Sequence, residues 1–142
     1  MILYTEVALG SPSNRGKIIP VTEITNYIEL ANNEPNQELY VSYYRFDEEI
    51  IEHQKRFNSL KGFDGKAYLN QIVLDIDKKE NTDEELLDET REFVNDICYG
   101  MDIPENYVIP WFSGNGYHIT LPNIFLFEAS NDLPRVVKNT LL

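Results

Sequence analysis

The spacing of hydrophobic and polar positions changes several times along the first half of the chain, which predicts short strands alternating with helices. The predicted elements are a strand over residues 2–9, a helix over residues 21–31, a strand rich in Tyr and Val over residues 39–46 and a helix from Asp47 to about Phe57. Asp47 stands where a helix-capping residue belongs. Gly- and polar-rich segments over residues 10–17 and 62–65 predict the intervening turns.

The middle of the chain carries the clearest pattern. Residues 67–77 predict a strand, and the apolar run before its last residues is typical of a buried central strand. Thr82 and Glu85 then form the Thr-x-x-Glu pattern of a capping box, and Gly100 is a plausible end for the helix that follows. Its predicted buried stripe consists of Leu86, Leu87, Phe93, Val94, Ile97 and Met101.

Two further strands are predicted over residues 107–113 and 117–121, joined by a turn at residues 114–116, and a helix over residues 132–142. The order strand, helix, strand, hairpin implies an α/β (α+β) fold, with a mixed β-sheet, a crossover helix and flanking helices. The length of 142 residues suits one domain over the whole chain.

Composition narrows the setting of the protein. No apolar run approaches the ~20 residues of a membrane-spanning helix, so no membrane partner is expected. The start of the chain lacks the basic and apolar segments of a signal peptide. Cys98 is the single cysteine, which excludes an internal disulfide and a multi-cysteine zinc site. A cytoplasmic location is the expectation that follows.

The net charge of −12 at first argues against a nucleic-acid partner, because phosphate binding favours a basic surface. The charge is unevenly placed, however. Residues 67–106 hold 12 acidic and 3 basic side chains, which is −9 of the total. The rest of the chain is therefore close to neutral and can carry local basic patches.

Asp75 and Asp77 form the first candidate site. In a strand, residues two apart point to the same face, with Cα atoms ~6.6 Å apart. Two carboxylates at that spacing can share a divalent cation or bracket a pair of cations ~3.5–4 Å apart. The alternative is a strand that emerges into solvent with its last acidic side chains hydrated.

The segment from Ser113 to His118 forms the second candidate site. Its Gly114, Asn115 and Gly116 can expose backbone amides that bind an anion, while Ser113 and His118 add side-chain donors. The imidazole of His118 is also a potential metal ligand. The alternative is an ordinary β-hairpin in which Asn-Gly is only a turn signal and the histidine is structural.

Together, the two candidate sites resemble the motifs of the archaeo-eukaryotic primase and primase-polymerase superfamily, in its phage and plasmid members. The first family motif, an apolar run that ends in Asp-x-Asp, matches residues 72–77. The second, of the Ser-Gly-x-Gly-x-His type, matches residues 113–118 and follows about 36 residues later. The resemblance spans roughly residues 39–122, and its specificity comes from the order and spacing of the two motifs.

The resemblance implies a nucleotidyltransferase of DNA replication, which transfers nucleotides from NTPs or dNTPs along a single-stranded DNA template with two Mg²⁺ or Mn²⁺ ions. It implies that Asp75 and Asp77 hold the metals and that His118 joins them as a catalytic residue. It also implies that Ser113, Gly114, Asn115, Gly116 and His118 bind the nucleotide. The resemblance also implies a helicase domain or subunit as a further partner.

The chain departs from the family pattern after His118. The family has a third acidic motif on a later strand, whereas the only downstream acids are Glu128 and Asp132, and Asp132 resembles a helix cap. We therefore expect the N-terminal part of a longer catalytic core, or a truncated member. A non-catalytic module that binds nucleotide or nucleic acid is the alternative, and a metal-dependent nuclease is a third option that leaves the hairpin unexplained.

Aromatic residues near Tyr40 offer another potential nucleic-acid surface. Tyr40, Tyr43, Tyr44 and Phe46 could stack on bases, although strand alternation places some of them in the core. Arg15 and Lys17 could contact DNA, although a solvated loop is the more ordinary role for them.

Overall fold

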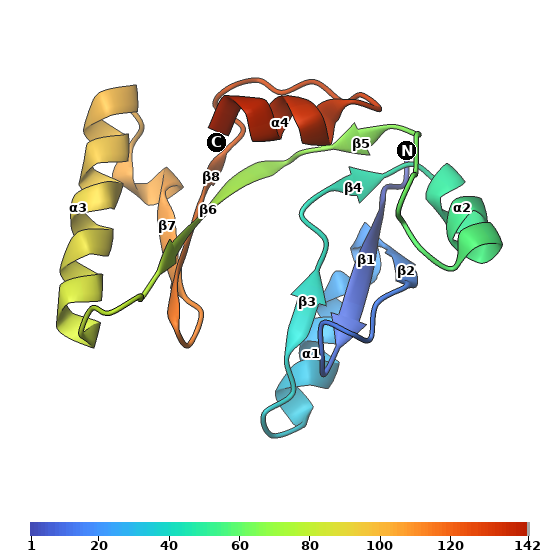
Figure 1. Ribbon diagram of the computed structural model, residues 1–142, viewed down its shortest axis with the longest axis horizontal. Coiled ribbons are helices and arrows are strands. Elements are labelled where there is room, and N and C mark those ends of the chain that lie inside the picture. The colour runs from blue at the N-terminus through green and yellow to red at the C-terminus, as the bar shows by residue number, and fades with distance from the viewer. Residues whose placement is uncertain (142) are drawn as a thin grey trace. The chain divides into compact units, whose positions relative to one another are not determined.

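The computed structural model describes residues 1–141, and its contacts divide the chain into two compact units (Figure 1). Unit 1 contains Met1–Leu69 and the segment from Phe127 onward, and unit 2 contains Asn70–Leu126. Unit 2 is therefore a continuous piece of chain between two segments of unit 1. The single domain over residues 1–142 stays a prediction.

Unit 1 contains a five-stranded antiparallel sheet centred on β1 (Tyr4–Leu9). The other strands are β2 (Lys17–Pro20), β3 (Leu39–Val41) and β4 (Arg45–Phe46), which pair with β1, and β5 (Ala67–Tyr68), which pairs with β4. The helical elements are η1 (Val21–Glu23), α1 (Ile24–Asn33), α2 (Glu49–Phe57) and α4 (Leu133–Leu141). The core of the unit includes the buried side chains of Val7, Ile19, Ile50, Leu133 and Val137.

Unit 2 contains a three-stranded antiparallel sheet in the order β6-β8-β7. Its elements are β6 (Gln71–Asp77), α3 (Asp83–Met101), η2 (Glu105–Tyr107), β7 (Ile109–Phe112) and β8 (Gly116–Pro122). Because β6 and β7 both pair antiparallel with β8, they run in the same direction, with α3 between them in the chain and β8 between them in the sheet. This arrangement is a split β-α-β unit.

One face of the unit 2 sheet is buried and the other is open. Ile72, Ile119 and Leu121 lie on the buried face, and α3 packs against this side (Figure 1). Residues that alternate with these three lie on the opposite face, where Asp75 and His118 are exposed. The α+β class with flanking helices is confirmed, and the strands form two sheets whose neighbouring strands are antiparallel.

Helix α3 confirms the predicted start but not the predicted end. The Thr82 hydroxyl accepts a hydrogen bond from the Glu85 amide at 3.2 Å, and the Glu85 carboxylate accepts one from the Thr82 amide at 2.8 Å. Gly100 lies inside the helix, which ends at Asp102 with a left-handed φ of 52°. The amide of Asp102 donates to the Cys98 carbonyl, so an aspartate takes the terminal position that favours glycine.

The predicted buried stripe of α3 is partly wrong. Leu86 and Ile97 are buried, whereas Phe93 and Met101 are 38% and 47% exposed. Thr90 is buried instead, because its hydroxyl donates to the Leu86 carbonyl at 2.7 Å and so needs no water.

Two predicted strands are each divided in the structure. Within residues 39–46, the Ser42 hydroxyl donates to the Tyr44 carbonyl at 2.6 Å, which bends the chain between β3 and β4. Residues 67–77 are split into β5 and β6, which belong to different sheets. The prediction of a central buried strand is therefore wrong, because β6 lies at an edge of its sheet and β8 is central.

Of the two predicted aspartate caps, only Asp132 directly precedes its helix, and its carbonyl accepts hydrogen bonds from the amides of Arg135 and Val136. Asp47 accepts a hydrogen bond from the Tyr68 hydroxyl at 2.9 Å, and no side chain caps α2. Asp132 precedes α4, and its carboxylate binds Arg135, which holds the pKa of Asp132 below its usual value. The α4 helix confirms the helix predicted near the end, although residue 142 lies outside the described residues.

No helix among residues 1–141 combines the length and apolar character that crossing a membrane requires.

Candidate functional site

Strand pairing in unit 2 brings the candidate residues of both motifs to one face of the sheet. The register pairs Asp75 with His118, and His118 with Trp111 on the other side. Two residues further along β6, it pairs Asp77 with Gly116, and a hairpin hydrogen bond joins Gly116 to Ser113. Since directly paired residues point to the same face, the two rows form one open surface.

Asp75 and His118 are in direct contact within the first row. The Nε2 atom of His118 lies 3.3 Å from Oδ1 of Asp75. The side chains are 60% and 50% exposed, respectively. This carboxylate and this imidazole, which are 43 positions apart in the chain, can therefore act on one ligand that approaches from solvent.

Gly116 lies between Asp77 and Ser113 in the second row, where β8 approaches β6 closely. A Cβ atom at position 116 would lie 2.4 Å from the backbone oxygen of Ile76, and this separation is too short for any side chain. The position therefore requires glycine for close approach of β8 to β6. The middle position of this row therefore carries no side chain.

Gly114 shapes the hairpin turn by a different mechanism. Its φ of 96° lies in the region that favours glycine, whereas Asn115 does not have a positive φ. This sign pattern matches a two-residue type II′ turn, with Gly114 and Asn115 at its tip. The amide of Ser113 donates to the Gly116 carbonyl at 2.9 Å, so this amide is not free to bind an anion. The predicted amide nest is accordingly smaller than the motif suggested, and the Ser113 hydroxyl and the His118 imidazole remain as donors.

The acidic residues alone do not form a complete metal cage. Among residues 1–141, no three His, Cys, Asp or Glu side chains gather in an arrangement that could hold a metal ion. Asp75 and Asp77 provide two exposed carboxylates on one face. Their donor chemistry nevertheless fits Mg²⁺ or Mn²⁺, because such ions often bind through one or two carboxylates and take further ligands from substrate phosphates.

Trp111 is a residue of this surface that the sequence did not identify. Its side chain is 56% exposed, and its Nε1 atom donates to the Thr120 hydroxyl at 3.0 Å. Its place directly before the second motif predicts a packing role that fixes the hairpin. Only the register, which places Trp111 opposite His118, shows that the indole shares the open face.

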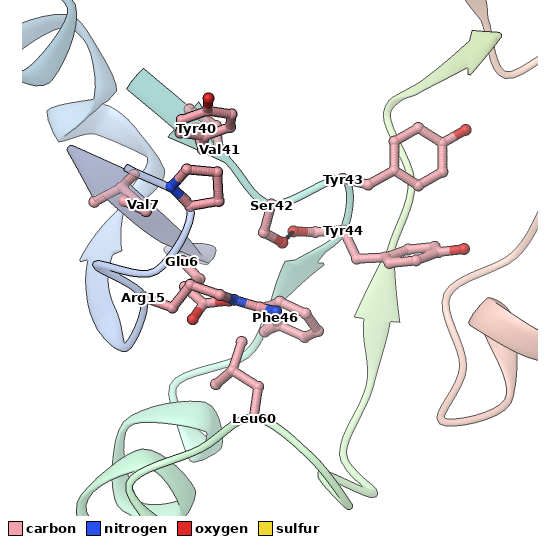
Figure 2. A pocket seen from close by; sticks show the side chains of 12 residues that line it. Glu6, Val7, Arg15, Tyr40, Val41, Ser42, Tyr43, Tyr44, Phe46 and Leu60 are labelled. Carbon is pink, nitrogen blue, oxygen red and sulfur yellow. Dashed lines mark hydrogen bonds and ion pairs between the residues drawn. The ribbon is translucent and has the colours of Figure 1, made fainter. Parts of the chain in front are cut away.

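Unit 1 contains a separate hollow of about 440 Å³ next to β1 and β3. Figure 2 shows Tyr40 and Val41 at one end of the lining and Phe46 and Leu60 at the other. The rings of Tyr43 and Tyr44 project away from the remaining side chains in this view and lie edge to face, 5.0 Å apart. The aromatic residues that the sequence suggested for base stacking therefore lie in unit 1, apart in the chain from the two motifs.

The charged groups at this hollow bind each other. Glu6 is 7% exposed, and its carboxylate accepts hydrogen bonds from Arg15 Nη2 at 2.9 Å and from the Gly16 amide at 2.8 Å. This contact raises the pKa of Arg15 above its ordinary value. Arg15 is thus tied to Glu6, which weakens the earlier suggestion that it binds DNA.

Arg45 on β4 is a partly buried cation of unit 1. Its guanidinium donates to the Thr5 hydroxyl at 3.2 Å and to the Ser42 carbonyl, and burial lowers its pKa. These neutral acceptors hold the bend between β3 and β4, so the role of Arg45 is structural.

No protein-family model matches the chain, and searches of the curated proteins and of the solved structures found no match for it either.

Proposed function

We propose that this chain binds a nucleoside triphosphate with Mg²⁺ or Mn²⁺ on the open face of unit 2, as part of a primase-polymerase type of nucleotidyltransferase. The observation that carries the proposal is the register of β6, β7 and β8. It brings Asp75, Asp77, Ser113 and His118, which come from two distant motifs, onto one solvent-exposed surface.

Asp75 and Asp77 are the residues that would hold the cations. Two carboxylates and no third acidic neighbour make a site that the triphosphate would have to complete. The cation would neutralise charge on the phosphates and lower the pKa of an attacking 3′-hydroxyl. Metal binding by the protein alone is then weak, and nucleotide strengthens it.

Ser113 and His118 would bind the phosphates. His118 Nε2 lies beside Oδ1 of Asp75, so phosphates held next to that carboxylate through a cation come within reach of the imidazole. The Ser113 hydroxyl would supply a donor in the neighbouring row, where Gly116 lies between Ser113 and Asp77. Donors on both rows would fix the orientation of the triphosphate before any chemistry.

A non-catalytic nucleotide-binding module is the second candidate. It is favoured by the absence, among residues 1–141, of a third acidic side chain gathered with Asp75 and Asp77. Both candidates predict nucleotide binding, and only the nucleotidyltransferase predicts transfer of nucleotides to a primer. A single-stranded DNA template and a helicase partner belong to the first candidate alone.

We expect Asp75→Asn/Asp77→Asn to abolish the nucleotide-dependent binding of Mn²⁺, which equilibrium dialysis of Mn²⁺ with ATP or dATP against the protein measures. The reason is that amide oxygens carry no charge to hold the cation. Glu92→Gln/Asp96→Asn is the matched control, because it removes two exposed carboxylates from α3 and leaves both rows intact.

Binding that survives in Asp75→Asn/Asp77→Asn, or that is missing in the unaltered chain, would overturn the proposal. Primer extension on single-stranded DNA with Mn²⁺ and dNTPs or NTPs then separates the two candidates. Extension by the unaltered chain supports the transferase, and binding without extension supports the module.

A further inference from the structure

Trp111 extends the first row of the candidate surface. The register runs from Asp75 on β6 through His118 on β8 to Trp111 on β7. Neighbouring strands lie ~4.8 Å apart, so Asp75 and Trp111 are separated by about 10 Å across the sheet. A carboxylate, an imidazole and an indole thus follow each other in a line perpendicular to the strands.

The indole is both exposed and held in place. Its Nε1 atom donates to the Thr120 hydroxyl at 3.0 Å, and that hydroxyl lies 3.3 Å from the Ile109 carbonyl and donates to it. The polar edge of the ring is therefore satisfied by the sheet, while 56% of the side chain remains in contact with solvent. An aromatic side chain that is fixed at its edge loses little conformational freedom when a flat ligand stacks on it.

From this geometry, and resting on the proposed function, we propose that Trp111 stacks on the base of the nucleotide whose phosphates lie at Asp75 and His118. The order of the row matches the order of groups in a nucleotide, with the charged phosphates at one end and the planar base at the other. Base–aromatic stacking tolerates every base, so the site would accept nucleoside triphosphates without strong preference among bases. Trp111 is then a binding residue, and discrimination among bases comes from elsewhere.

The chain supplies its own probe, because Trp111 is its single tryptophan. We expect ATP with Mn²⁺ to quench the Trp111 fluorescence, whereas inorganic tripolyphosphate with Mn²⁺ binds without such quenching because it has no base. Calorimetry on the same ligands should show that the unaltered chain binds ATP more tightly than tripolyphosphate.

Trp111→Ala should weaken ATP binding roughly tenfold, which is within the range for loss of one base–aromatic stack. It should leave tripolyphosphate binding unchanged. Trp111→Phe keeps an aromatic ring and should retain most of the affinity for ATP. Phe112→Ala is the matched control, because Phe112 is an exposed aromatic residue on the same strand whose side chain points to the opposite face.

Five outcomes overturn the inference. Equal losses for ATP and tripolyphosphate in Trp111→Ala would assign the indole a structural role, and unchanged affinity for both would leave it no role in binding. If the Trp111 fluorescence changes with protein concentration but not with ATP, this face is a contact between copies of the chain. If neither ligand binds the unaltered chain with Mn²⁺, the proposed function fails, and the stacking role fails with it. Binding of both ligands without a difference between them removes the stacking role alone.

Discussion

Single residues set the distance between the strands that carry the candidate surface. Gly116 pairs with Asp77, and a Cβ atom added to it would lie only 2.4 Å from the Ile76 backbone oxygen. Gly100 offers the opposite case, since an added Cβ there would meet nothing within 4 Å. The glycine of the hairpin is therefore required by packing, whereas the glycine of α3 is not.

Gly116→Ala should lower the free energy of unfolding by about 1–3 kcal/mol, the usual cost of forcing an extra group into a packed site. Gly100→Ala should raise it by up to about 1 kcal/mol, because alanine in a helix interior loses less backbone entropy. Urea denaturation followed by circular dichroism and by Trp111 fluorescence measures both. Equal stability of Gly116→Ala and the unaltered chain would contradict the close approach of β8 to β6.

Among the elements, α3 links β6 to β7 and covers the buried face of their sheet. Its start depends on local chemistry, because Thr82 and Glu85 satisfy each other's amides in a capping box. Its middle depends on packing, because Leu86 and Ile97 are buried against the rest of unit 2. The helix is thus stabilised by local hydrogen bonds at its start and by tertiary packing along its middle.

Thr82→Ala should reduce the free energy of unfolding by about 1 kcal/mol, since it leaves the Glu85 amide without its acceptor. Thr82→Ser keeps the oxygen and should remain close to the unaltered chain. The same urea titrations measure the difference. A loss of similar size in both variants would mean that the methyl group of Thr82, and not its hydroxyl, stabilises the helix start.

Across the whole molecule, the negative charge is concentrated in unit 2. Residues 70–126 hold 12 acidic and 3 basic side chains, or −9, and the remaining residues hold 12 and 9, or −3. Most of these acids lie on α3, which packs on the face opposite the candidate site. Divalent cations at Asp75 and Asp77 would reduce the repulsion where a nucleic acid would have to approach.

We therefore expect this chain to bind single-stranded DNA weakly, with a dissociation constant no tighter than the ~10⁻⁴–10⁻⁶ M of nonspecific complexes, and to bind it better with Mn²⁺ than without. Fluorescence anisotropy of a labelled oligonucleotide measures this. Asp75→Asn/Asp77→Asn should reduce the effect of Mn²⁺ on the affinity for the oligonucleotide. Glu92→Gln/Asp96→Asn should change that effect less. Tight binding that needs no metal would show a basic surface that the charge distribution does not predict.

Local sequence signals predicted most elements of the fold. The capping box, the hairpin turn at residues 114–116 and the helices near residues 24–33, 49–57 and 133–141 depend on neighbours in the chain. The division of residues 67–77 between two sheets was missed because it depends on distant contacts, namely which strands lie beside them. The end of α3 was a local error, because Gly100 stays helical and the Asp102 amide donates to the Cys98 carbonyl.

The sequence by itself determined which side chains are available for a site, namely two carboxylates with strand spacing and a glycine hairpin with a serine and a histidine. Tertiary structure alone decided that these groups meet, because pairing between β6 and β8 joins residues 43 positions apart, and a shift of one residue would send Asp75 and His118 to opposite faces. The same pairing placed Trp111 in their row. Spacing along a chain fixes which residues share a strand face, whereas register between strands fixes which faces become one surface.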